Sequence, residues 1–123
     1  MSFSVKDQET HDSMLRIWVK TLQGLGYVEL SASLPEYLTK PQPVGGGSIP
    51  DLIARNPENH WVIGEVKVRD DVDNAHTRGQ LQDYVRTGSK VMFLVPGSCL
   101  ESTKRTLQSW NLGSVEVWSH SGT

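Results

Sequence analysis

The stretches IPDLI at residues 49–53 and IGEVKV at residues 63–68 decide the fold of this chain. Both are predicted to be strands, and the NPEN segment at residues 56–59 between them has the composition of a turn. We therefore expect a β-hairpin. If Arg55 pairs with Trp61 around a five-residue loop, the odd-numbered residues of both strands share one face of the sheet.

This register predicts that two carboxylates face each other. Asp51 would lie opposite Glu65, with Cβ atoms about 4.5–5.5 Å apart, and the ammonium group of Lys67 would follow on the same face. Like charges that face each other destabilise a sheet, and a hard divalent cation compensates them because Mg²⁺ accepts one or two carboxylates. We expect this face to be presented outward and the other face of the second strand to be core, with Val62, Gly64, Val66 and Val68.

Helices and further strands are predicted on either side of the hairpin. Apolar residues at three- and four-residue steps predict helices at residues 12–24, 75–86 and 100–112. Strands are predicted at residues 27–30, 49–55, 61–69, 90–95 and 115–118, and an irregular loop at residues 31–48. The order of these elements indicates an α/β domain with a mixed central sheet flanked by helices.

Five or six residues of this pattern resemble the PD-(D/E)XK nuclease superfamily. Pro50-Asp51 matches the first half of its motif and Glu65-Val66-Lys67 the second. Gln80 and Tyr84 lie one turn apart on the following helix, which resembles the glutamine-containing helix of resolvase-like and VRR-type nucleases. The resemblance implies a restriction-endonuclease-like fold with an αβββαβ core, formed by residues 1–123 as a single domain.

The resemblance also implies metal-dependent phosphodiester hydrolysis. Asp51 and Glu65 would hold Mg²⁺, or Mn²⁺ as a substitute, with the Val66 carbonyl as a further ligand. Lys67 would orient or deprotonate the attacking water, and Gln80 would position that water or the phosphate. An acid from the first helix is often a further ligand in this superfamily; Glu9 is our first choice, with Asp12 and Glu29 as alternatives.

The charge balance requires any nucleic-acid contact to be local. The chain has 12 Lys and Arg against 14 Asp and Glu, a formal net charge of −2, whereas proteins that bind nucleic acid nonspecifically are usually basic. A bound cation or a basic patch would have to supply the attraction. The residues expected to contact nucleic acid are Arg55, Arg69, Arg78 and Tyr84. The tryptophans are expected mostly in the core, with Trp61 stacked on Arg55 as the alternative for that residue.

Several classes of protein do not match the composition. The longest apolar run is too short to span a bilayer, and residues 1–7 lack the layout of a signal peptide. The single cysteine, Cys99, excludes an internal disulfide and indicates a reducing compartment, with the cytoplasm as the expected location. The four histidines have no metal-ligand spacing; His11 is expected at the edge of the core.

These observations predict a metal-dependent endonuclease that acts on DNA, with RNA as an open alternative. Because 123 residues leave no room for a separate recognition domain, a structure-selective enzyme such as a junction resolvase is favoured, either as a homodimer or as a subunit of a larger nucleoprotein complex. Two other interpretations stay open. The chain could be a catalytically silent nucleic-acid-binding or scaffold module, or the two carboxylates could form a glycosidase pair.

Overall fold

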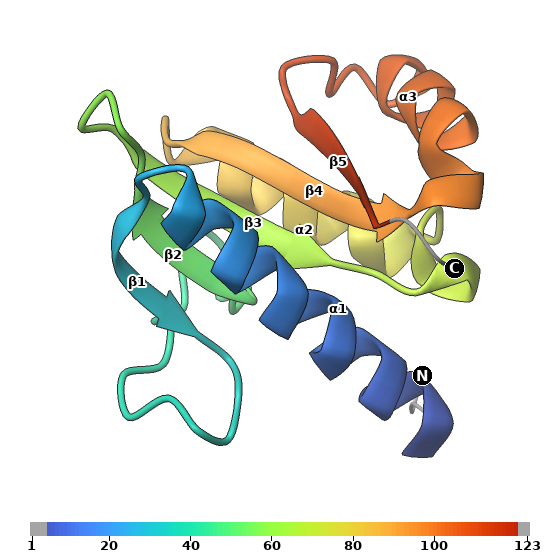
Figure 1. Ribbon diagram of the computed structural model, residues 1–123. Coiled ribbons are helices and arrows are strands. Elements are labelled where there is room, and N and C mark those ends of the chain that lie inside the picture. The colour runs from blue at the N-terminus through green and yellow to red at the C-terminus, as the bar shows by residue number, and fades with distance from the viewer. Residues whose placement is uncertain (1–4, 121–123) are drawn as a thin grey trace.

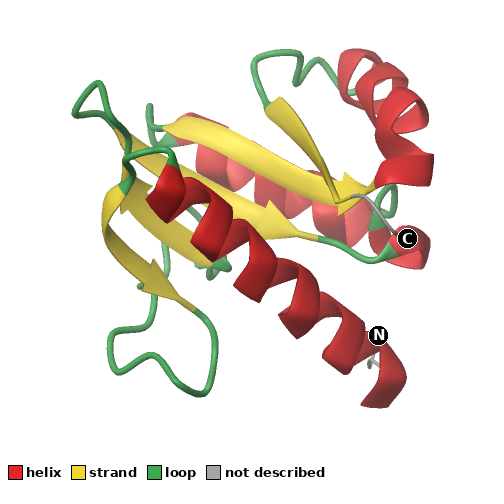
Figure 2. Cartoon of the chain, viewed as in Figure 1, coloured by secondary structure: helices red, strands yellow, loops and turns green. Residues whose placement is uncertain are grey.

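The computed structural model describes residues 5–120, which form an open five-stranded mixed sheet with three helices (Figures 1 and 2). The strands lie in the order β1-β2-β3-β4-β5; the first two pairings are antiparallel and the last two parallel. The elements are α1 (Val5–Gly24), β1 (Val28–Ala32), β2 (Leu52–Arg55), β3 (Trp61–Val66), α2 (Ala75–Arg86), β4 (Lys90–Pro96), α3 (Leu100–Ser109) and β5 (Glu116–His120), with 3₁₀ turns η1 (Arg69–Asp71) and η2 (Gly97–Cys99). This order confirms the predicted succession of helices and strands.

The predicted register of the central hairpin is confirmed. Arg55 pairs with Trp61, and the pairing continues to Leu52 opposite Gly64. Strand β2 begins at Leu52 and not at residue 49, because Pro50 has no N–H to donate to the ladder.

Helix α1 is longer than the sequence predicts. It begins at Val5, although the apolar spacing begins only at His11, and it ends at Gly24 as expected. The first turns bury little surface, so they lack the periodic apolar signal that identified the rest of the helix. This extension places polar residues of α1 beyond the region where the helix packs on the sheet (Figure 1).

Helix α2 has the bounds that the sequence predicts. The side chain of Asn74 caps its start by accepting a 2.8 Å hydrogen bond from the Thr77 N–H. The loop that precedes β2 is hydrogen-bonded to this helix: Ser48 Oγ donates to Asp83 Oδ2 at 2.6 Å. Gly45 also lies against α2, where a Cβ atom would come within 2.8 Å of the Asp83 carbonyl oxygen.

The last elements differ from the predicted bounds by a few residues. Helix α3 ends at Ser109 and not at residue 112, and β5 covers Glu116–His120 instead of residues 115–118. Strand β4 is buried on both faces after its first residue, as its apolar run predicts. Within residues 5–120, no helix has the length and apolar character to cross a membrane.

Both faces of the sheet are covered, which corrects the expectation that one face of β3 is presented outward. Helix α1 packs on the face formed by Leu52, Val62 and Val66, whereas α2 and α3 pack on the face of Ile63 and Phe93. The charged residues predicted on β3 therefore lie under α2. This position, and not the strand itself, determines their electrostatics.

Candidate active site

The structure brings the two predicted carboxylates and the lysine together at the end of β3. Glu65 is on the strand, Lys67 follows it, and Asp51 directly precedes β2. All three residues are buried, with exposed fractions of 3%, 7% and 9% for Glu65, Lys67 and Asp51. Charged side chains are almost never buried to this extent unless they are paired, so the partners of each group decide what the site can do.

One carboxylate oxygen of Glu65 accepts a hydrogen bond, and the other faces the ammonium group of Lys67. The hydroxyl of Tyr84 donates a 2.6 Å hydrogen bond to Oε1, and Nζ of Lys67 lies 3.6 Å from Oε2. Burial and the neighbouring negative charge of Asp51 raise the pKa of Glu65 well above its usual range, against the opposing effects of Lys67 and Tyr84. Burial and the neighbouring carboxylate thus disfavour the ionised form of Glu65.

Asp51 is held by the backbone and by a histidine. Its Oδ2 accepts a 2.7 Å hydrogen bond from the Val66 N–H, and Nε2 of His11 lies 3.2 Å from the same oxygen. Nδ1 of His11 lies 3.2 Å from Oδ1 of Asp12. Burial lowers the pKa of His11, but the hydrogen bonds and charges of Asp51 and Asp12 outweigh it, so the pKa lies above its ordinary value.

His11 is a site residue that the sequence did not reveal as such. Its only signal was its position on the apolar stripe of α1, one turn before Met14 and Leu15, which indicated the edge of the core. No motif links a residue on the first helix to Asp51, which is 40 positions away in the chain. The contact depends on how α1 crosses the sheet.

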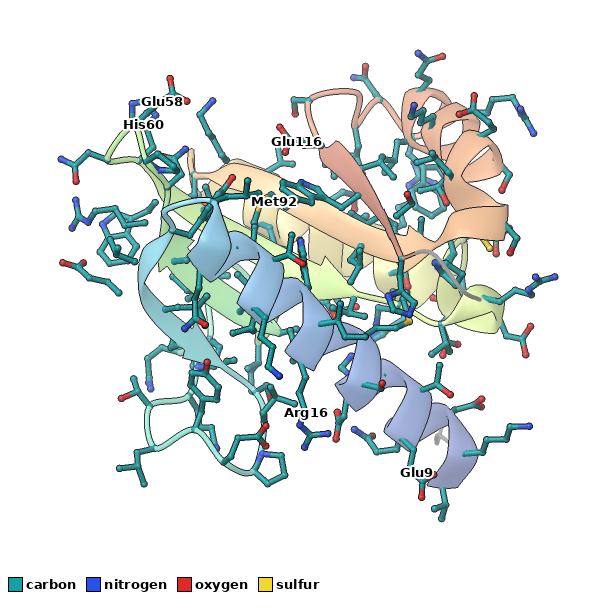
Figure 3. All side chains as sticks on the ribbon, in the orientation of Figure 1. Glu9, Arg16, Glu58, His60, Met92 and Glu116 are labelled. Atoms are coloured by element: carbon teal, nitrogen blue, oxygen red, sulfur yellow. The ribbon has the colours of Figure 1, made fainter. Side chains whose placement is uncertain are left out.

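Glu9 does not join the cluster. It is exposed, and its side chain points away from the sheet in Figure 3. Residues two positions apart on a helix differ by about 200° in direction, so Glu9 and His11 occupy opposite sides of α1. The expected acidic ligand from the first helix is therefore replaced by His11 as the α1 residue that reaches Asp51. Of the two alternatives, Asp12 contacts His11 and Glu29 forms an ion pair with Arg55.

Tyr84 has a different environment from the one expected of a nucleic-acid contact. It is fully buried, and its hydroxyl is committed to Glu65. Burial and the negative charge of Glu65 raise the pKa of Tyr84, so the phenol keeps its proton and acts as a donor at neutral pH. Its place is inside the carboxylate cluster.

Gln80 lies one turn before Tyr84 on α2 and is half-buried. Its Oε1 is buried and has no hydrogen-bond partner among the described residues. A buried acceptor without a donor is costly, at about 1–3 kcal/mol, and is therefore worth explaining. The helix predicted to carry a site glutamine thus contributes an acceptor that a water molecule or another ligand can satisfy.

The predicted arginines each have a partner of their own. Arg55 forms an ion pair with Glu29 at 3.1 Å and stacks on Trp61, with Cζ 4.4 Å from the ring centroid, as the sequence suggested. Arg69 donates a 2.7 Å hydrogen bond to Ser98 Oγ. Arg78 is exposed on α2, 6.0 Å from the ring of Trp110.

Few residues of the site could supply ligand atoms to a metal ion. The part of the chain that the structure describes has no group of three or more His, Cys, Asp or Glu that could hold a metal ion. The two carboxylates of Asp51 and Glu65 are hard ligands of the kind Mg²⁺ takes. The N–H of Val66 donates to Asp51, and in a strand the C=O of the same residue points to the same side, where Pro50 has no N–H to offer.

No family model matches this chain, and neither a curated protein nor a solved structure matches it.

Proposed function

We propose that this protein is a metal-dependent endonuclease that hydrolyses phosphodiester bonds in DNA, with a restriction-endonuclease-like fold and a PD-(D/E)XK site. The order of helices and strands supports this assignment, as do the positions of Asp51 beside β2 and of Glu65 and Lys67 at the end of β3. The proposal depends on one observation above all: Asp51 and Glu65 are buried as neighbours with a single ammonium group beside them.

A structural role explains this cluster poorly. Removing charges from water costs several kcal/mol for each ion, and apolar residues of similar volume often stabilise a protein at least as well as a buried ion pair does. Here the second carboxylate makes the balance worse, because its charge raises the pKa of Glu65. A divalent cation bound between the carboxylates removes this penalty.

Asp51, Glu65 and the carbonyl of Val66 would hold Mg²⁺ or Mn²⁺. Two carboxylates suffice, because Mg²⁺ is usually bound by one or two of them together with waters and substrate phosphates. When bound, the ion lowers the pKa of a coordinated water and offsets negative charge on the phosphate.

The other buried residues then have separate tasks. Lys67 donates hydrogen bonds to the scissile phosphate or to the attacking water, and Oε1 of Gln80 accepts one from that water. Tyr84 and His11 are positioning residues, because the Tyr84 hydroxyl donates to Glu65 and Nε2 of His11 contacts Asp51, the two carboxylates that would hold the ion. Cleavage of both strands of a branched DNA needs two such sites, which a symmetric dimer provides.

The proposal is tested by combining Mn²⁺ calorimetry with a cleavage panel of single-stranded, duplex, flap and four-way DNA. Glu65→Gln keeps the shape of the side chain and should lose both metal binding and cleavage. Lys67→Met should keep metal binding and lose at least about 100-fold in cleavage rate. Glu101→Gln and Lys104→Met change an exposed ion pair on α3 and serve as matched controls.

Two results would contradict the proposal. Wild-type protein that binds no Mn²⁺ and cuts none of the panel is not a metal-dependent nuclease. If it nevertheless binds DNA, it is a catalytically silent nucleic-acid-binding module, which the lack of a third acidic ligand among the described residues favours as the alternative. Cleavage by Glu65→Gln at the wild-type rate would place the chemistry elsewhere.

A further inference from the structure

Trp61 lies on the surface between two hollows. It is 44% exposed, whereas Trp18 on α1 is 2% exposed and packs in the core. One hollow, of about 480 Å³, lies over β1 and β2, and the other, of about 510 Å³, lies beside the β2–β3 turn; Trp61 lines both. Figure 3 shows this turn, with Glu58 and His60, projecting from the sheet. A large aromatic side chain in this position is available to a ligand.

The ring of Trp61 is held in place by a fixed guanidinium group. Cζ of Arg55 lies 4.4 Å from its centroid. Arg55 is in turn held by Glu29, at 3.1 Å from Nε, and by Asn59, which accepts from Nη1 at 2.9 Å. Tryptophan and arginine are the side chains on which nucleobases stack most readily, and a rigid pair loses little entropy when a base binds.

This pair is on the same face of the sheet as the carboxylate cluster. Trp61, Ile63 and Glu65 alternate along β3 toward α2, and Arg55 lies directly opposite Trp61. Four residues of a strand span about 13 Å, so Trp61 lies about 13 Å from Glu65 along β3. A nucleic-acid strand bound at the carboxylates can therefore reach the ring within a few nucleotides.

The hollow over β1 and β2 has the chemistry of a base site. Leu30 and Ile53 give it an apolar floor, and Thr39, Lys40 and Gln42 on the long loop give it polar groups. Its volume is within the range of about 300–1,000 Å³ that is typical of small-ligand sites.

We propose that Trp61 and Arg55 form a stacking platform for an unpaired base of the strand that is bound at Asp51 and Glu65. The inference rests on the proposed function in one respect, namely that the ligand is a nucleic acid. A base inside a duplex is already stacked on both faces, so only a single-stranded segment can present a base to the ring. The substrate would then be a DNA with an unpaired segment close to the scissile phosphate.

The experiment measures binding without metal, so that it does not depend on cleavage. Fluorescence anisotropy at one fixed salt concentration, with EDTA, compares a labelled 12-nucleotide oligo-dT with an abasic strand of the same length, which keeps the phosphates and lacks the bases. Wild type should bind oligo-dT at least about fivefold more tightly than the abasic strand. Trp61→Ala should lose this preference and bind both strands equally, whereas Trp61→Phe should keep part of it.

The control is Leu38→Ala, which removes a fully exposed apolar side chain from the long loop and should leave the preference unchanged. An oligo-rU arm separates RNA from DNA as the source of the unpaired base. The stacking proposal is overturned if Trp61→Ala keeps the wild-type preference for oligo-dT, or if wild type has none. Its failure differs from that of the nuclease proposal: a protein that cuts DNA without this preference retains the nuclease, and one that prefers oligo-dT through Trp61 but cuts nothing retains the platform.

Discussion

The two faces of β3 are both buried, yet they are built from different side chains. Under α1, the strand presents Val62, Gly64 and Val66, which lie in an apolar core with Leu52 and Trp18. Under α2, it presents Ile63 and then Glu65, whose carboxylate meets a phenol, an ammonium group and a second carboxylate. One strand thus separates a core that stabilises the fold from a cluster that costs stability.

The two faces of β3 therefore contribute differently to the stability of the fold. Apolar burial gives about 25 cal/mol for each Å² removed from water, so the α1 face needs no further explanation. Buried charges lower the stability of a fold, and the rest of the structure must compensate for them. Residues that are buried in spite of this cost are often metal ligands or catalytic groups. Mutations on the two faces should therefore change stability by different amounts and, in one case, with opposite sign.

The largest loss of stability is expected from Leu52→Ala on the α1 face. Leu52 is completely buried, and the cavity left by a Leu→Ala change in a core costs about 2–5 kcal/mol of unfolding free energy. Urea denaturation measures the loss. Ile49→Ala, three residues earlier and 54% exposed, should change stability by less than about 0.5 kcal/mol. Equal effects of the two changes would mean that the α1 face is not the principal core.

Gly64→Ala should destabilise the same face by overfilling it. A Cβ atom at position 64 would lie 2.8 Å from Cγ of Leu52 and 2.9 Å from Cη2 of Trp18, both buried in the core, so these side chains would have to shift. The expected cost is about 1–3 kcal/mol in urea denaturation. Gly79→Ala on α2 is the matched control, because nothing lies within 4 Å of its Cβ position, and it should stabilise the helix by up to about 1 kcal/mol.

Tyr84→Phe should show that the α2 face depends on hydrogen bonds. It removes the donor to Oε1 of Glu65 and leaves a buried acceptor unpaired, which should cost about 1 kcal/mol in urea denaturation. The pKa of Glu65 should rise further, because the Tyr84 hydrogen bond lowers it in the wild type. Unchanged stability in Tyr84→Phe would indicate that Oε1 of Glu65 finds another hydrogen-bond donor.

An effect of the opposite sign is expected from Glu65→Gln in metal-free buffer. The folded pKa of Glu65 is raised, so the folded state binds more protons than the unfolded state between the unfolded pKa, about 4.3, and the raised folded value. Wild-type stability should therefore fall as the pH rises through that interval, and Glu65→Gln should lack this fall and be the more stable protein above it. His11, with its own raised pKa, adds a fall above about pH 6.5 in both proteins.

Thermal melts at several pH values with EDTA measure this difference. Added Mn²⁺ should raise the melting temperature of the wild type and leave that of Glu65→Gln unchanged, because a ligand stabilises only the state that binds it. A wild-type protein that becomes more stable as the pH rises from 5 to 7 would show that the carboxylate pair carries no penalty.

Local patterns were sufficient for the hairpin and for three site residues. The turn at residues 56–59 sets the register, and strand alternation then places Asp51, Glu65 and Lys67 together without knowledge of the rest of the fold. The bounds of α2 could be predicted for the same reason, since its cap and its apolar spacing lie within its own segment. The fold class followed from the order of the elements.

Contacts between elements that are distant in the chain could not be predicted from such local patterns. His11 reaches Asp51 across 40 positions, and Tyr84 turns inward to Glu65 although it was expected to contact nucleic acid. Glu9 looked suitable because it is acidic and on the right helix, but the direction of a helical side chain depends on how the helix is rotated against the sheet.

The sequence by itself determined which residues pair across the central hairpin, because a turn and a two-residue period act over a few positions of the chain. Only the tertiary structure decided that the charged face of β3 is enclosed and that a histidine and a tyrosine complete it. The enclosure comes from α2, which packs on the sheet because of its own apolar residues such as Leu81, and burial then turns an ordinary pair of carboxylates into a strongly perturbed one.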